Sequence, residues 1–556
     1  MQKIFRYFYV MGSMTPKSAY LLLFLLLQTL MYGQKTVLIK VNFPDKKIER
    51  TLKIPAKVSD EDRLQQFTDS LRQSGYLFAS CKSSIIEKNS ILFECESGTK
   101  FNTVQIDLSS ITPYLKEQAE SILMKPAELP AFMESITAKL QDQGMALAGL
   151  KTVVTEERAD QVFLKVEISN TTVRKISNLI FAENTEIPKN VLKHLKARYR
   201  RSIFNDKTIS KIEAEINNLK FARIARKSEV LFTKDSTLLY IYDEKVRNNR
   251  FEGFAGLQNA DNKLVVNGYL DLALVNILKS SEEFQLNWKT DGQEQRNFFF
   301  SGTLPYLFNS NLVLRGQLNI FRQDSTFQTS KSAIEIGYLL KHNSRIFLGY
   351  ESGESSDIQS QNSETLQDFR STFYTVGFDF SRNAESDDYF RYTDFVNLKL
   401  GLGKSVRETN EVDQTLLRLT GSYNIAFSAK SRVQINTDNY FLGSQKILVN
   451  ELYRFGGFNS IRGLNENVLQ AHSFTSLMNN YYYLVAPNLN VQILSDFGFF
   501  SDQTTNISKT VFAAGAGFVL ATKNGFLNFT YAFSRLSGTE NSFRNALAHI
   551  SFKSYF

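Results

Sequence analysis

The sequence predicts small α+β units at the N-terminal end, followed by an all-β transmembrane antiparallel barrel of about sixteen strands. Helical periodicity occurs only up to about residue 245, and from Arg250 onward period-two segments of about ten residues follow one another. The 46 Phe and 24 Tyr stand beside a single Trp and crowd the second half of the chain. This aromatic bias is typical of strands that face a non-aqueous phase.

The first element is the apolar run from Ala19 to Met31, which follows Lys17 and precedes Tyr32-Gly33-Gln34. A charged segment, an apolar segment and a small residue in this order are typical of a secretory signal peptide. The run is too short for a spanning helix, which needs roughly 20 apolar residues. We therefore expect a signal peptide over residues 1–33 and an exported mature chain. No Cys follows the cleavage point, so a lipid anchor is not expected there.

A similar helical pattern then occurs three times, with Leu71, Leu140 and Ile216 at equivalent positions about 70 residues apart, which is the spacing of a repeated domain. Each helix presents one apolar stripe and is followed by strand-like segments. We expect each unit to be a small sheet covered by two helices, in the order β-α-α-β-β. The units are predicted over residues 35–98, 100–170 and 171–246, with shorter helices over Tyr114–Leu123 and Lys189–Tyr199.

The two cysteines, Cys81 and Cys95, are equidistant from Lys88 in a predicted hairpin. They would face each other across the strand pair and form a disulfide in an oxidising compartment. The register of the hairpin cannot be read from the sequence, so two buried thiols remain the alternative.

The second half, residues 250–556, alternates between apolar and polar residues, as in Leu264–Val275, Arg432–Phe441 and Leu527–Arg535. A soluble sandwich would also alternate. The number of segments, their terminal aromatics and the lack of covering helices favour a closed membrane barrel, in which every backbone group is paired.

The longest predicted loop of the barrel, residues 444–474, contains the segment from Phe455 to Glu466, with Ser460-Ile461-Arg462-Gly463-Leu464 at its centre. A lone Arg-Gly pair in a loop is normally a turn. The glycine-rich approach and this core, however, resemble the long-loop motif of the superfamily that contains BamA, TamA and the two-partner secretion transporters. The repeated units likewise resemble POTRA domains, although Lys220 stands in the third copy where the others have Gly75 and Gly144. The motif residues are Gly456, Gly457, Arg462, Gly463 and Leu464.

The resemblance implies that the loop folds back into the barrel and that Arg462 meets an Asp on the inner wall. Leu494-Ser495-Asp496-Phe497-Gly498 supplies that Asp, together with a glycine, Gly498, that would let the loop backbone approach the strand. Alternation separately places Asp496 on the face opposite Ile493, so it should point into the lumen. A buried Arg–carboxylate pair would hold the loop in register. The alternative is an unpaired loop Arg beside a solvated Asp.

The chain ends on an aromatic strand in which Ile550, Phe552 and Phe556 share one face. This strand resembles the signal by which barrel proteins are recognised for insertion, which marks the chain as a client of such machinery. Lys553 stands where relatives often have Gly, so a hinge at that point is not expected.

Other functions find little support. The formal charge of +9 is dispersed, without a basic groove for nucleic acid. Gly403-Lys404-Ser405 lacks the first glycine of a P-loop, and the four histidines have no metal-ligand spacing. We therefore expect no enzyme activity, no cofactor and no metal site.

Three repeats before a barrel agree best with a TamA-like layout. The resemblance implies an outer-membrane protein with its repeats in the periplasm, a factor that captures unfolded outer-membrane or exported proteins on repeat edges. It would insert them through the seam between Arg250–Leu257 and Asn545–Phe556, and a periplasmic or inner-membrane protein could assist. The alternative is a pore that secretes a partner protein through the lumen. A nutrient porin would leave the repeats without a purpose.

Overall fold

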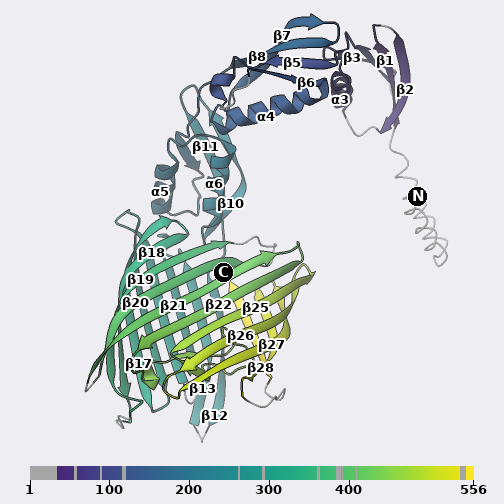
Figure 1. Ribbon diagram of the computed structural model, residues 1–556. Coiled ribbons are helices and arrows are strands. Elements are labelled where there is room, and N and C mark those ends of the chain that lie inside the picture. Colours follow the sequence, from purple (N-terminus) through teal and green to yellow (C-terminus); the bar gives the residue numbers. More distant parts are fainter. Residues whose placement is uncertain are drawn as a thin grey trace, which may run out of the picture. The chain divides into compact units, whose positions relative to one another are not determined.

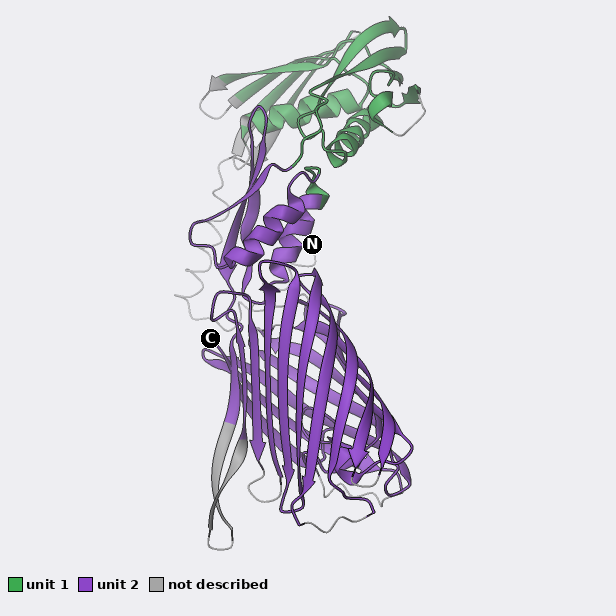
Figure 2. Ribbon diagram, turned by 90° about the vertical axis from the view of Figure 1, so that its left-hand side faces the viewer, with its two compact units in different colours: residues 1–175, 203–207 green, residues 176–202, 208–556 purple. Residues whose placement is uncertain are grey.

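The computed structural model describes residues 34–44, 46–55, 59–87, 90–115, 120–260, 263–290, 295–359, 364–383, 390, 392–407, 410–538 and 546–556. The predicted signal peptide, residues 1–33, lies outside them. The chain divides into two compact units, coloured separately in Figure 2: residues 1–175 with 203–207, and residues 176–202 with 208–556. No helix among the described residues is long and apolar enough to cross a bilayer.

The first unit begins with a four-stranded sheet in the order β2-β1-β4-β3, which α3 covers. Val37, Ile39 and Phe93 of the sheet are buried, and Leu64 and Leu71 of the helix pack against this core. The elements are β1 (Gln34–Asn42), β2 (Lys47–Pro55), α3 (Asp60–Gln73), β3 (Ser80–Glu87) and β4 (Ser90–Glu96).

A second sheet in the order β6-β5-β8-β7 follows, and Ile136 and Leu140 of α4 are buried against it. The helix expected over Tyr114–Leu123 is wrong in its second half, because Ser121–Met124 is an edge strand. Ile122 faces the core there while its neighbour Leu123 is exposed, which is a period of two. The elements are β5 (Thr103–Asp107), a 3₁₀ turn (Thr112–Tyr114), β6 (Ser121–Met124), a 3₁₀ turn (Pro126–Glu128), α4 (Leu129–Asp142), β7 (Gly149–Arg158) and β8 (Gln161–Ser169).

The third sheet has the order β10-β11-β9 and carries two helices. It alone follows the expected β-α-α-β-β order; the first two sheets have a second strand in place of the first helix. The helix expected over Lys189–Tyr199 is confirmed as α5. The elements are β9 (Asn178–Phe181), α5 (Lys189–Tyr199), α6 (Asp206–Asn217), β10 (Ala222–Phe232) and β11 (Thr237–Lys245).

The residues directly after helices α3, α4 and α6 make a backbone hydrogen bond with the chain segment that follows the last strand of the same small sheet. The Gly75 carbonyl accepts the Phe101 N–H at 2.9 Å, and the Gly144 carbonyl accepts the Arg174 N–H at 2.8 Å. In the third copy the Phe221 carbonyl accepts the Val246 N–H at 3.0 Å, just before the barrel begins. The residue after the helix therefore makes the same contact in each copy, with the segment that leads into the next domain.

The barrel is closed and consists of sixteen antiparallel strands, as predicted (Figure 1). Because the fold is even-numbered and antiparallel, neighbouring strands are joined by alternating loops at its two ends. The strands are β12 (Arg250–Ala260), β13 (Lys263–Val275), β14 (Glu283–Thr290), β15 (Gln295–Leu307), β16 (Leu312–Gln323), β17 (Phe327–Lys341), β18 (Ser344–Asp357), β19 (Phe369–Asn383), β20 (Thr393–Arg407), β21 (Glu411–Ala426), β22 (Ser431–Ser444), β25 (Ser473–Ala486), β26 (Leu489–Asp502), β27 (Ile507–Thr522), β28 (Gly525–Leu536) and β29 (Leu547–Tyr555).

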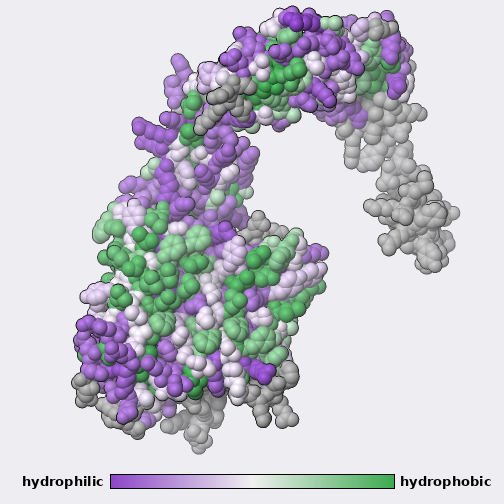
Figure 3. Space-filling model, in the orientation of Figure 1, coloured by the Kyte–Doolittle hydropathy of each residue, from purple (hydrophilic) through white to green (hydrophobic). Residues whose placement is uncertain are grey.

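The outer wall of the barrel is apolar and its interior is polar. Leu348 and Leu402 point outward with about two thirds of their surface exposed (68% and 69%), whereas the inward Glu335 is 2% exposed. Apolar side chains gather over the barrel strands in Figure 3. This arrangement is the inverse of a soluble protein and suits contact with lipid. The barrel therefore suits a membrane, and the small sheets precede it in the chain.

Closure between the first and last strands is short. Among the described residues, β12 and β29 share the pairs Arg250↔Tyr555, Phe251↔Ser554 and Glu252↔Lys553. The remainder of β12, from Gly253 to Ala260, pairs with β13 alone among the described residues. The barrel thus has a seam that is closed by backbone pairing at one end only.

Candidate functional site

The loop between β22 and β25, residues 445–472, forms a small hairpin of β23 (Tyr453–Phe455) and β24 (Leu469–Ala471) and packs against the inner wall. Tyr453 stacks on Tyr440 of β22, with ring centroids 4.7 Å apart, and its hydroxyl donates to Asp438 Oδ2 at 2.7 Å. Phe455 stacks on Phe474 of β25 at 3.9 Å. Aromatic packing of this kind fixes the entry of the loop into the lumen.

The structure brings Arg462 and Asp496 together. The backbone N–H and Nε of Arg462 donate to Asp496 Oδ2 at 3.0 and 2.9 Å, and its Nη2 donates to Oδ1. Arg462 also donates to the side-chain oxygen of Asn480 and, at 3.4 Å, to the carbonyl of Asn479, both on β25. The Asp496 side chain is fully buried and that of Arg462 is 8% exposed. The pair is bidentate and desolvated, so removal of either partner would leave a buried charge.

Around this pair the backbone of the loop comes close to the wall. Gly463 has φ +76°, and a Cβ on it would lie 2.6 Å from the backbone carbon of Phe533 on β28. The Ser534 hydroxyl donates to the Gly463 carbonyl at 2.8 Å. Leu464 packs against the apolar cluster between the loop and the wall, which includes Phe455. Only glycine suits this position.

The other predicted glycines of the site are Gly456 and Gly457 in the loop and Gly498 on strand β26 of the wall. Gly456 and Gly457 form the turn after β23. A Cβ at Gly498 would lie 2.9 Å from Val511 Cγ1 of β27 and 3.2 Å from Ile461 Cδ1 of the loop, so the glycine makes room for these two side chains. Sequence reasoning expected the glycine to let the loop backbone approach the strand, and the loop meets it here with the Ile461 side chain.

A second buried ion pair fixes the first part of the loop, around residues 449–451, to the barrel wall. Glu451, in the 3₁₀ turn Val449–Glu451, pairs with Arg407 Nη2 of β20 at 2.9 Å, and both side chains are at most 3% exposed. Its Oε1 accepts Ser405 Oγ at 2.7 Å and Gln414 Nε2 at 2.9 Å, and its Oε2 accepts the Leu448 N–H at 2.8 Å. Sequence reasoning missed this cluster, because a single Glu in a polar loop carries no periodic or motif signal.

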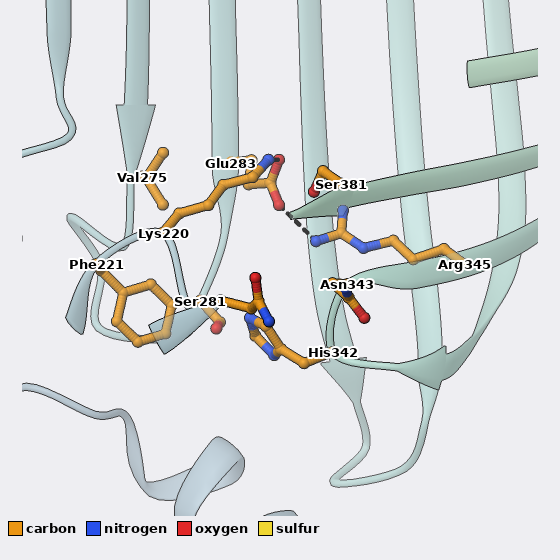
Figure 4. A pocket seen from close by; sticks show the side chains of 10 residues that line it. Lys220, Phe221, Val275, Ser281, Glu283, His342, Asn343, Arg345 and Ser381 are labelled. Carbon is orange, nitrogen blue, oxygen red and sulfur yellow. Dashed lines mark hydrogen bonds and ion pairs between the residues drawn. The ribbon is translucent and has the colours of Figure 1, made fainter. Parts of the chain in front are cut away.

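At the opposite end of the barrel, Lys220 of the third sheet unit contacts the barrel rim (Figure 4). Its Nζ lies 2.6 Å from Glu283 Oε2 of β14, and Arg345 Nη2 of β18 lies 2.5 Å from Glu283 Oε1. Burial lowers the pKa of His342, in the β17–β18 turn, to about 3. Its ring meets that of Phe221 edge-on, with the ring centroids 6.2 Å apart. The lysine that replaces the glycine of the repeat signature therefore forms an ion pair with the barrel, which directly follows this copy in the chain.

The terminal residues Ile550, Phe552 and Phe556 are all exposed on the outer face. The Phe556 N–H donates to the Asn249 carbonyl at 3.0 Å, and Lys553 Nζ lies 3.3 Å from Glu252 Oε2 across the seam. The last strand is thus joined to the first by these contacts beside the three backbone pairs.

Cys81 and Cys95 are directly opposite on β3 and β4 and form a disulfide. Among the described residues, no group of three or more His, Cys, Asp or Glu side chains is arranged to hold a metal ion.

No protein-family model matches the chain, and no curated protein matches its sequence. Solved structures do resemble it. CdiB from Acinetobacter baumannii is 12% identical with a TM-score of 0.51, covering 94% of this chain and 90% of that one. CdiB from Escherichia coli is 12% identical with a TM-score of 0.50, covering 90% and 100%. BamA from Haemophilus ducreyi lacking POTRA domains 1–3 is 13% identical with a TM-score of 0.46, covering 81% and 98%. At these identities, the likeness to the two CdiB structures concerns the fold alone.

Proposed function

We propose that the protein is an outer-membrane assembly factor, which binds unfolded client proteins on its periplasmic sheets and passes them into the membrane through the barrel seam. The short pairing of β12 with β29 carries this proposal. Eleven residue pairs join β12 to β13, whereas three join it to β29. Since each backbone hydrogen bond contributes about 0.5–1.5 kcal/mol net, opening the seam costs less than opening the other strand pairs of the wall, of which β28–β29 has seven residue pairs among the described residues.

The unpaired edges at the seam favour a strand as the ligand. Among the described residues, Gly253–Ala260 of β12 and Leu547–Phe552 of β29 are not paired with each other, so each presents backbone groups at the seam. Unpaired N–H and C=O groups are costly next to lipid, so an extended client segment that adds to either edge would be stabilised there.

Client capture would occur on the edge strand β3 of the first sheet. β10 has two register shifts and β7 has one near the middle of its pairing, and such bulges disfavour strand addition. β3 also has one register shift, between Ile85 and Glu87, but it lies at the end of the strand, and the pairing is regular from Ser80 to Ile85. This regular part of β3 therefore offers an edge for an extended client.

Export of a partner protein through the lumen is the second candidate. The inner wall favours it in one respect: it carries a charged network in which Lys399 Nζ lies 2.8 Å from Glu335 and 3.3 Å from Glu351, and Arg315 Nη1 lies 3.2 Å from Glu335. A polar wall of this kind suits an unfolded chain in transit once the loop is displaced.

The test is insertion of an unfolded barrel client into liposomes that contain the purified protein. Phe251→Cys with Ser554→Cys places a disulfide across a seam pair, and Leu348→Cys with Val376→Cys places one across a wall pair as the matched control. We expect the oxidised seam variant to lose protease-protected insertion and to regain it on reduction, while the control inserts normally. Insertion that is unaffected by the seam disulfide would contradict the proposal. Conductance that rises in Arg462→Ala, without any insertion by the wild type, would favour the secretion pore.

A further inference from the structure

The loop tip, defined as residues 458–466, contacts strands on both sides of the seam from inside the barrel. On the C-terminal side, Ser534 of β28 donates to the Gly463 carbonyl, and the Phe458 ring lies 5.5 Å from the ring of His549 on β29. On the N-terminal side, Glu466 Oε2 lies 2.7 Å from Lys289 Nζ of β14. One short segment therefore connects the first strands of the barrel with the last.

The Lys289 contact is level with the part of the seam that lacks backbone pairing. Lys289 is paired with Tyr269 of β13, and Tyr269 is paired with Phe254 of β12. Phe254 lies two residues beyond Glu252, where pairing of β12 with β29 ends. The ion pair thus lies where the wall itself provides no closure.

Glu466 is held in place by the loop. Its Oε1 accepts the Phe458 N–H at 3.1 Å, and a Cβ at Gly457 would collide with its carboxylate. Its Oε2 remains directed at Lys289. A carboxylate held in this way loses little conformational freedom when it pairs with a cation, which favours the contact.

The two sides of the seam are attached to the loop unequally. The loop is fixed to β26 by the buried Arg462–Asp496 pair and to β28 through Gly463. The loop tip is joined to the first strands through the Lys289–Glu466 ion pair to β14. The side chains of this pair are 30% and 35% exposed, so salt and water reach them.

We propose that the Lys289–Glu466 pair is an internal strap across the seam, which holds β12–β14 against β28 and β29 where strand pairing is absent. Release of the strap, by loss of either charge or by a competing charged segment, lets the first strands move away from the last. This inference concerns the closed state of the barrel and holds whether the protein inserts clients or secretes them.

The strap is tested by the distance between spin labels across the seam in the full-length protein. Labels at Phe300→Cys of β15 and Tyr531→Cys of β28 flank it, both positions face outward, and the native cysteines are bonded to each other. In Lys289→Glu we expect a longer and broader distance distribution than in the wild type. Lys289→Arg should retain the wild-type distribution, because it keeps the positive charge, and high salt should shift the wild type toward the longer distances.

Two controls separate the strap from general loosening of the barrel. Lys404→Glu reverses the charge of Lys404 and so breaks its exposed ion pair with Glu411, which joins β20 and β21. It should leave the seam distance unchanged. A second label pair, Leu402→Cys and Ile493→Cys, reports on the wall away from the seam. A wild-type seam distance in Lys289→Glu would overturn the proposal, and so would an equal change at the second label pair.

Discussion

The two sides of the seam differ in how they are held. The C-terminal side bears the buried Arg462–Asp496 pair and the close approach of Gly463 to β28. The N-terminal side is held through β14, by the partly exposed Lys289–Glu466 pair near one end and by Lys220–Glu283 at the other. Buried, multiply bonded contacts persist, whereas exposed ion pairs are weak and are screened by salt. We therefore expect the loop and the last strands to behave as one rigid part, and the first three strands to be the movable part.

Arg462→Ala breaks the rigid side and should have the largest effect. It leaves the Asp496 carboxylate fully buried without its cation, which costs about 3–5 kcal/mol of stability. Denaturant unfolding of the protein in liposomes, followed by the gel mobility of the folded barrel, measures this loss. Arg370→Ala is the matched control, because the Arg370–Glu354 pair is exposed and should change stability by about 0.5 kcal/mol or less. Equal losses in the two variants would contradict the assignment of the rigid side.

Much of this rigid side was predictable from the sequence. The pairing of Asp496 with Arg462 was implied by the resemblance of the loop motif, whereas alternation along β26 placed Asp496 inward, because this signal is local and periodic. The count of about sixteen strands was predictable for the same reason. The segment Tyr114–Leu123 was not, since the short apolar run at its end, Ile122–Met124, fits a helix and a strand equally well.

The movable side could not be found from the sequence. Lys289 and Glu466 are far apart in the chain, and neither belongs to a motif. An ion pair between single charges leaves no pattern, because any other charge of the strand face or the loop could have been the partner. The same holds for Glu451 and Arg407. In contrast, the departure of Lys220 from the repeat signature was visible, although its contact with Glu283 was not.

Glu451→Gln tests whether the outer end of the loop belongs to the rigid part. The amide keeps the shape of the side chain but turns an N–H₂ group toward donors, among them Arg407 Nη2 or Ser405 Oγ. We expect a loss of about 1.5–3 kcal/mol, the usual contribution of hydrogen bonds to a charged group. Hydrogen exchange should become faster in residues 445–452 and remain slow around Arg462. Faster exchange at both places would mean that the loop is held as a single unit.

Lys220→Ala should have the smallest effect, and it acts on the movable side alone. Glu283 keeps Arg345 as its partner, so the carboxylate is not left unpaired, and the loss should be about 1 kcal/mol or less. Lys207→Ala, which removes the exposed Lys207–Asp142 pair, is the control. We expect faster hydrogen exchange at the β13–β14 turn, residues 276–282, in Lys220→Ala and not in the control. Because β14 bears both Glu283 and Lys289, freeing its rim end should also lower the salt concentration at which the seam labels move apart. Unchanged salt dependence would show that the Lys220–Glu283 and Lys289–Glu466 contacts act independently. The two ends of β14 would then move separately rather than as one part.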